Sequence, residues 1–122
     1  MRIALMDVKM TPLAQLPHEL RRYPRKEFEQ SAKILVQGSA PMECRTMDIS
    51  AGGIAAVVRQ PIPVGNSCVL AMETHVDFRN RRINVWGKVV YCCPVPDGFR
   101  IGIEHRDYDS MSRMCLQQLC AA

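Results

Sequence analysis

Short segments in which apolar and polar residues alternate run through most of this chain of 122 residues. In the first segment Ala32, Ile34 and Val36 share one face, whereas Lys33 lies on the other. The later segments are MECRTMDI, GIAAVVRQ, SCVLAMETHV, RINVWGKVVYCC and FRIGIEH, divided by turn signals such as QGSAP, PIPVGN and PVPDG. A period of two residues is typical of strands with one buried face. The pattern predicts a mainly β protein, either a small antiparallel barrel or a sandwich.

Two details of the later strands bear on the site. The stretch HVDFRNRR, residues 75–82, is interpreted as a polar break between two strands. In the strand that follows, strict alternation places Ile83, Val85, Val89 and Tyr91 on one face. The single tryptophan, Trp86, falls on the opposite face, where it could pack against a ligand or against the N-terminal arm; the alternative is a tryptophan packed in the core.

The two ends of the chain depart from the strand pattern. Residues 1–20 contain Pro12 and Pro17, which interrupt a Leu-rich segment, so they are expected to form a flexible arm. At the other end the apolar residues recur at helical spacing and a capping residue precedes them, which predicts one helix at about residues 109–120. We therefore expect one domain over residues 21–122 that this helix closes.

Composition excludes several classes of protein. The chain carries 16 basic and 12 acidic residues, a modest excess that does not favour a nucleic acid polymer as partner. Its six cysteines form no C-x-x-C pair and no signal peptide precedes them, so we interpret them as apolar side chains in a reducing cytoplasm. No apolar run approaches the ~18 residues of a membrane span, so no membrane insertion is expected.

Catalysis and metal binding have no support in the sequence. No Ser-His-Asp or Cys-His grouping is visible, so we expect no enzyme activity. His18, His75 and His105 have no spacing that suggests metal ligands, so no metal site and no cofactor are expected.

Two short motifs suggest a binding site instead. The stretch RRYPR, residues 21–25, gathers three guanidinium groups, although alone it could be a solvated basic stretch. The stretch DISAGG, residues 48–53, combines a carboxylate, a hydroxyl and two glycines, although Asp, Ser and Gly also build turns. Together, the donors of one motif and the acceptors of the other indicate a planar, phosphate-bearing ligand.

These motifs, in this order and followed by a β-rich body with the strand GFRIGIEH and a closing helix, resemble the PilZ family of bacterial cyclic di-GMP receptors. Arg21 and Arg25 match the family's R-x-x-x-R, and Asp48, Ser50 and Gly53 match its D/N-x-S-x-x-G. The resemblance implies an antiparallel barrel of six to seven strands with a C-terminal helix.

The resemblance also implies the ligand and the role of each residue. Arg21 and Arg25 would hold phosphates and the O6/N7 edge of a guanine, with Arg22 as an auxiliary phosphate contact. Asp48 would accept the N1 and N2 hydrogens of guanine, and Ser50 would add a hydrogen bond. Gly53 would let the backbone approach the ligand or turn.

The implied function is that of a receptor that changes its surface on binding cyclic di-GMP and signals to an unidentified effector protein. In the family such outputs concern motility, exopolysaccharide or virulence. Leu20, in place of an arginine before the motif, favours one ligand per chain, and the protein is expected to be a monomer or weak dimer. The alternative is a PilZ-like module that binds protein and no nucleotide. A single-strand nucleic-acid barrel ranks last because aromatic residues are few.

Overall fold

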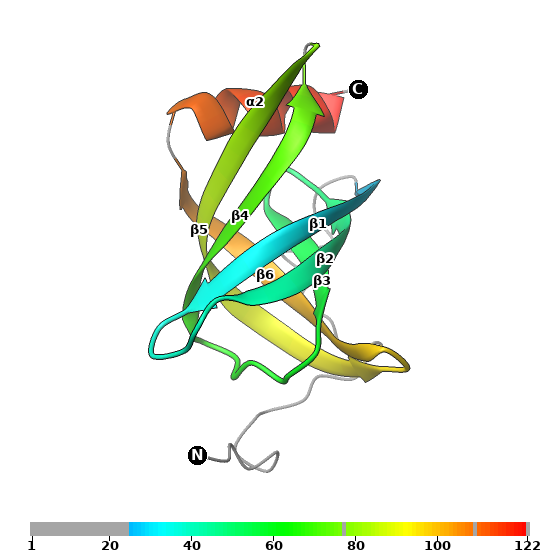
Figure 1. Cartoon of the computed structure of the whole chain (residues 1–122), viewed down its shortest axis with the longest axis vertical. Coiled ribbons are helices and arrows are strands. Elements are labelled where there is room, and N and C mark those ends of the chain that lie inside the picture. The colour runs from blue at the N-terminus through cyan, green and yellow to red at the C-terminus, as the bar shows by residue number, and fades with distance from the viewer. Residues whose placement is uncertain (1–24, 77, 109, 122) are drawn as a thin grey trace.

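The computed structural model describes residues 25–76, 78–108 and 110–121, so the predicted arm and the residues Arg21 and Arg22 lie outside it. Six antiparallel strands form a closed barrel in the order β1-β2-β3-β6-β5-β4 (Figure 1). The elements are β1 (Lys26–Val36), β2 (Met42–Ile49), β3 (Gly53–Val58), β4 (Ser67–Val76), β5 (Arg79–Val95), β6 (Gly98–Tyr108) and α2 (Ser110–Ala121). The predicted barrel is confirmed, with six strands rather than seven.

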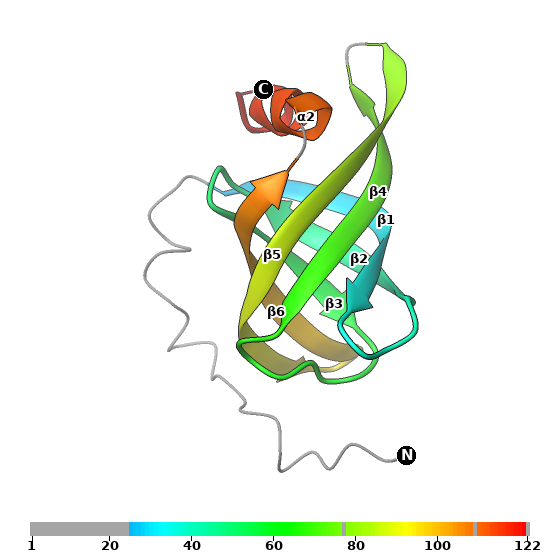
Figure 2. The ribbon, with the colours of Figure 1, turned by 90° about the vertical axis from the view of Figure 1, so that its left-hand side faces the viewer.

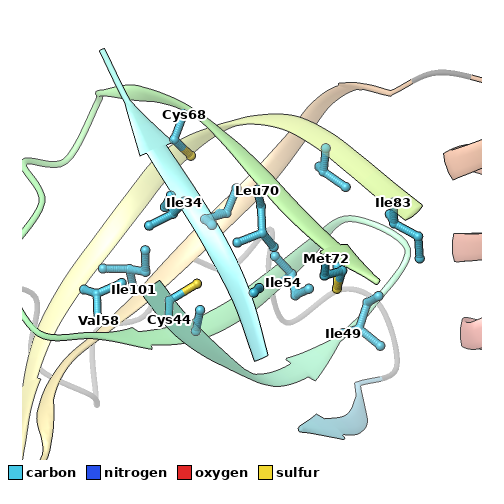
Figure 3. Close-up of a cluster of buried hydrophobic side chains, with 14 of the residues drawn as sticks. Ile34, Cys44, Ile49, Ile54, Val58, Cys68, Leu70, Met72, Ile83 and Ile101 are labelled. Atoms are coloured by element: carbon cyan, nitrogen blue, oxygen red, sulfur yellow. The ribbon is translucent and has the colours of Figure 1, made fainter. Parts of the chain in front are cut away.

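The core lies inside the barrel and is built from alternate residues of each strand, as the sequence predicts (Figure 3). Ile34, Leu70 and Ile101 come from three different strands and are completely buried. Strands β1 and β4 close the ring, with Ala32 opposite Met72. Closure leaves each of these strands with two hydrogen-bonded neighbours.

The interpretation of residues 75–82 as a polar break is wrong. Strand β4 extends to Val76 and strand β5 begins at Arg79, and the two form a two-stranded ribbon in which Val76 pairs with Arg79 and Glu73 with Arg82. The ribbon extends beyond the rest of the barrel beside α2 (Figures 1 and 2). Val76 is buried and belongs to the core cluster, so this apolar residue compensates for the polar composition around it.

Helix α2 lies across one end of the barrel, close to its predicted position (Figure 2). Cys115 and Leu116 are buried in the core cluster. Two hydrogen bonds hold the helix: the Asn84 amide donates to Ser112 Oγ at 2.9 Å, and Lys26 Nζ donates to the Leu119 carbonyl at 3.1 Å. Among the residues that the structure describes, no helix is long and apolar enough to cross a membrane.

The cysteines behave as small apolar side chains. All six are free thiols, and all except Cys120 are buried. Burial raises the pKa of Cys44 to about 12 and that of Cys68 to about 11. Both thiols therefore stay protonated at neutral pH, which suits their place in the core.

Register shifts reverse the alternation at two points and thereby create the site. On β2, Thr46 pairs with the core residue Ala56, but a shift at Met47 sets Asp48 opposite Ala55, which lies outside the core cluster. On β5 a shift between Val89 and Tyr91 has the same effect. Tyr91 therefore does not share the inward face of Val89, as strict alternation predicts, but packs in a separate small cluster.

Strand β1 also contains an extra residue, between Glu27 and Gln30, where it pairs with β2. The fully buried hydroxyl of Thr46 holds this irregular stretch by donating to the Phe28 carbonyl at 2.6 Å, with the Gln30 carbonyl at 3.2 Å. The shift brings Glu27 opposite Asp48. Thr46 therefore helps to determine where the start of β1 lies relative to Asp48.

We predict that Thr46→Val lowers the free energy of unfolding by about 1–3 kcal/mol, because it keeps the shape of the side chain but removes the hydroxyl that donates to part-buried carbonyls. Urea denaturation measures the change. Thr46→Ser is the matched control, since it keeps the hydroxyl and loses one methyl group. If Thr46→Ser destabilises the protein more than Thr46→Val does, methyl packing rather than the hydrogen bond holds the irregular stretch.

Candidate functional site

A row of four residues on the outward-facing side of the barrel wall underlies the candidate site, and two of them, Ala55 and Tyr91, are buried. Asp48 on β2 pairs with Ala55 on β3, Ala55 pairs with Gly102 on β6, and Gly102 pairs with Tyr91 on β5. Their neighbours Ile54, Ala56, Ile101 and Ile103 belong to the core, so the row faces outward. Two small residues thus separate a carboxylate from a phenol.

The Asp48 carboxylate forms ion pairs with two arginines. Arg25, which directly precedes β1, donates from Nη1 to Oδ1. Arg100 on β6 donates from Nη2 to Oδ2 at 2.6 Å. The side chains of both arginines are 25% exposed and that of Asp48 is 16% exposed, so water screens these contacts only in part.

Arg100 is also fixed at its other end. Its Nε donates to the hydroxyl of Tyr91 at 3.3 Å. Burial alone lowers the pKa of Arg100, but the bond to Tyr91 and the charge of Asp48 outweigh burial and raise it. Gly102 makes room for the Tyr91 ring: a Cβ at this position would lie 2.0 Å from Tyr91 Cε2.

Ser50 builds the turn between β2 and β3. Its Oγ accepts hydrogen bonds from the amides of Gly52 at 3.3 Å and Gly53 at 3.2 Å. Its own amide donates to the Gly53 carbonyl at 2.9 Å. Ser50 is fully buried, so its hydroxyl shapes the backbone next to Asp48.

His105 on β6 holds the same turn from the other side. Its amide donates to the Gly52 carbonyl at 3.0 Å. Burial lowers the pKa of the imidazole to about 4, although a hydrogen bond to the backbone of Ala51 acts in the opposite direction. Nε2 is buried without a hydrogen-bond partner within the part of the chain described, so the neutral ring is favoured.

The structure therefore brings Arg25, Asp48, Ser50 and Gly53 together from two motifs that lie apart in the sequence. Trp86 does not join them. It is half-exposed on the outer face of β5, five residues before Tyr91, a distance of roughly 16 Å along an extended strand.

Sequence reasoning missed three members of the site: Tyr91, Arg100 and His105. Tyr91 was assigned to the inner face because the extra residue in β5 gives no clear sequence signal. Arg100 and His105 both lie in the stretch GFRIGIEH, but alternation places only Arg100 on the face opposite the core residues Ile101 and Ile103, whereas His105 shares the face of those isoleucines. The signal that could have identified Arg100 is its outward position on β6, which pairs with β3, the strand that begins at the end of DISAGG.

The site offers both hydrogen-bond donors and hydrogen-bond acceptors. Two guanidinium groups and one carboxylate give it a net positive charge, which suits an anion. The carboxylate can accept hydrogen bonds from a base edge. Over residues 25–76, 78–108 and 110–121, no group of three His, Cys, Asp or Glu side chains could hold a metal ion.

A family model described as the PilZ domain matches residues 19–122. The chain belongs to the PilZ family. PilZ domains are binding and adaptor modules. No curated protein matches the chain.

Two solved structures share the PilZ fold with this chain. The Bacillus subtilis inhibitor of motility MotI/DgrA is 22% identical, with a TM-score of 0.71, and the match covers 83% of this chain and 49% of that one. The PilZ domain of CeSA from a cellulose-synthesising bacterium is 16% identical, with a TM-score of 0.55, and the match covers 80% and 95%. The chain thus spans about half the length of MotI/DgrA.

We predict that the stability of this PilZ domain falls as the pH is lowered from about 6.5 towards 4. The unfolded chain binds a proton at His105 in this range and the folded chain does not, so lower pH favours unfolding. Urea denaturation across this range should show a smaller loss for His105→Asn than for the wild type. His75→Asn changes an exposed histidine and is the control; an equal effect of both variants would contradict the assignment to His105.

Proposed function

We propose that this PilZ domain is a cyclic di-GMP receptor without enzyme activity, which signals to a partner protein through a surface that changes on binding. The observation that carries the proposal is the meeting of Arg25, Asp48 and the Ser50 turn on one outer patch of the barrel. Cyclic di-GMP is a ring that presents two phosphates and two guanines, so it needs both cations and acceptors.

Each residue has a distinct role in the proposal. Arg25 binds a phosphate or the O6/N7 edge of a guanine through bidentate hydrogen bonds, and Arg21 and Arg22 add charge from the same motif. Asp48 accepts the N1 and N2 hydrogens of guanine. Ser50 acts indirectly, because its hydroxyl already holds the turn.

One glycine and the single tryptophan remain to be assigned. Gly53 is the last residue of the turn and accepts the Ser50 amide, so its role is to shape the backbone beside Asp48. Trp86 is left out of the proposed contacts because it lies well along β5 from Tyr91.

The partner is proposed to be an effector protein in motility, exopolysaccharide or virulence control. One structural neighbour is an inhibitor of motility, and the other is a PilZ domain from a cellulose-synthesising bacterium. Both neighbours therefore fall within the range of outputs that the resemblance implies. We further propose that the protein acts in the cytoplasm, as a monomer or weak dimer, with one ligand per chain.

A second candidate function is a PilZ-like interaction module that binds no nucleotide. The observation in its favour is that both oxygens of Asp48 already have guanidinium partners, which a ligand would have to replace or share. Isothermal titration of the purified protein with cyclic di-GMP decides between the two candidates.

We predict that Arg25→Ala abolishes measurable binding of cyclic di-GMP and leaves the fold intact. Arg25 lies before β1 rather than within the ladder, and each charge-assisted hydrogen bond that it forms contributes about 1.5–3 kcal/mol. Arg82→Ala, which removes an exposed arginine from the β4–β5 ribbon, is the matched control. Calorimetry showing that Arg25→Ala binds within about twofold of the wild type would remove Arg25 from the site.

We predict that Asp48→Asn reduces selectivity as well as affinity. An amide of the same size is neutral and replaces one acceptor oxygen by an NH2 donor, which cannot accept a guanine hydrogen. Competition between cyclic di-GMP and cyclic di-AMP measures the selectivity of the variant and the wild type. If both discriminate equally well, Asp48 does not recognise the guanine edge.

A further inference from the structure

The two guanidinium groups that share Asp48 are held in different ways. Arg100 lies within the barrel wall, where it pairs with Val57 on β3 and with Cys93 on β5. Arg25 lies one residue before β1, at the end of the ladder. The backbone of Arg100 is therefore fixed by two strands, whereas that of Arg25 lies outside the regular pairing.

The side chain of Arg100 is fixed as well. Its Nε donates to the Tyr91 hydroxyl while its Nη2 donates to Asp48, so the planar group is held at two points. The Tyr91 ring in turn is 1% exposed and packs so closely on Gly102 that no Cβ would fit there. The position of the hydroxyl is thus set by the barrel itself.

We propose that Arg100, held by Tyr91, is the permanent partner of Asp48 and a positioning residue for ligand recognition, whereas Arg25 is the partner that exchanges. This inference rests on the proposed function. A phosphate of the ligand replaces Asp48 as the partner of Arg25, and Asp48 Oδ1 becomes available to the guanine. Arg100 remains on Oδ2 and keeps the carboxylate oriented towards the guanine.

The geometry accommodates this exchange without an unpaired charge. A carboxylate has about four lone-pair sites, so Oδ2 can keep Arg100 and still accept one hydrogen of guanine while Oδ1 accepts the other. Arg25 leaves the Asp48 carboxylate for a phosphate of the ligand, so it keeps a charge-assisted hydrogen bond to an anion. Arg100 thus compensates for the negative charge that Arg25 leaves behind.

Tyr91→Phe tests the proposal because it keeps the ring over Gly102 and removes only the hydroxyl. We expect cyclic di-GMP to bind about tenfold more weakly, the effect of one hydrogen bond to a charged group, with a parallel loss of selectivity over cyclic di-AMP. In an Arg100→Gln background the same change should alter affinity by less than about twofold, because Tyr91 acts through Arg100. Tyr108→Phe, which changes another phenol near the barrel end, is the control and should have no effect.

A ligand-free measurement separates this inference from the proposed function. NMR of the arginine Nε–Hε groups should show slow solvent exchange at Arg100 in the wild type and faster exchange in Tyr91→Phe. Added cyclic di-GMP should then shift the Arg25 signal and leave that of Arg100 in place.

Two results would overturn the inference: an equal loss of affinity from Tyr91→Phe in both backgrounds, or exchange at the Arg100 Nε–Hε group as fast as at the exposed Arg59. A wild type that binds no cyclic di-GMP would overturn the proposed function and the exchange of Arg25. The ligand-free spectra would still decide whether Tyr91 fixes Arg100.

Discussion

The candidate site depends on the constraint that a closed barrel places on its side chains. Alternate residues must point inward to fill the core, so an outward functional side chain must follow the same strict period. The extra residues in β2 and β5 break that period once each and turn Asp48 and Tyr91 outward. The contacts of Arg100, which bonds to both of these side chains, depend on the two shifts.

The same constraint explains how much could be predicted from the sequence. Alternation identified the strands and the core because most residues obey it, and the motifs RRYPR and DISAGG identified Arg25 and Asp48 because they are local. Strict alternation predicts the wrong face for Tyr91 because no particular residue type in β5 marks the extra residue. The polar composition of residues 75–82 led to the wrong prediction of a break between strands. Two buried residues of the ribbon, Thr74 and Val76, are enough to anchor this polar hairpin.

The site combines a rigid part with a part at the edge of the rigid structure. Arg100, Tyr91 and Gly102 lie within the paired strands, whereas Arg25 lies just before β1. The Ser50 turn is held by its own hydroxyl and by His105, so the acidic side of the site is also fixed. One side of such a site is formed before the ligand binds. Ligand binding therefore costs little conformational entropy on that side.

The strand order of the barrel has a consequence for how the site forms during folding. Asp48 and Arg100 are 52 residues apart, and the ring closes through β1 and β4, which are also distant in sequence. Contacts of such long range form slowly, because the entropy of closing long loops must be overcome first. The cluster therefore exists only in chains that have completed the barrel. A ligand that recognises the cluster would bind the native state alone and raise its population by mass action, so binding and folding are linked through one equilibrium.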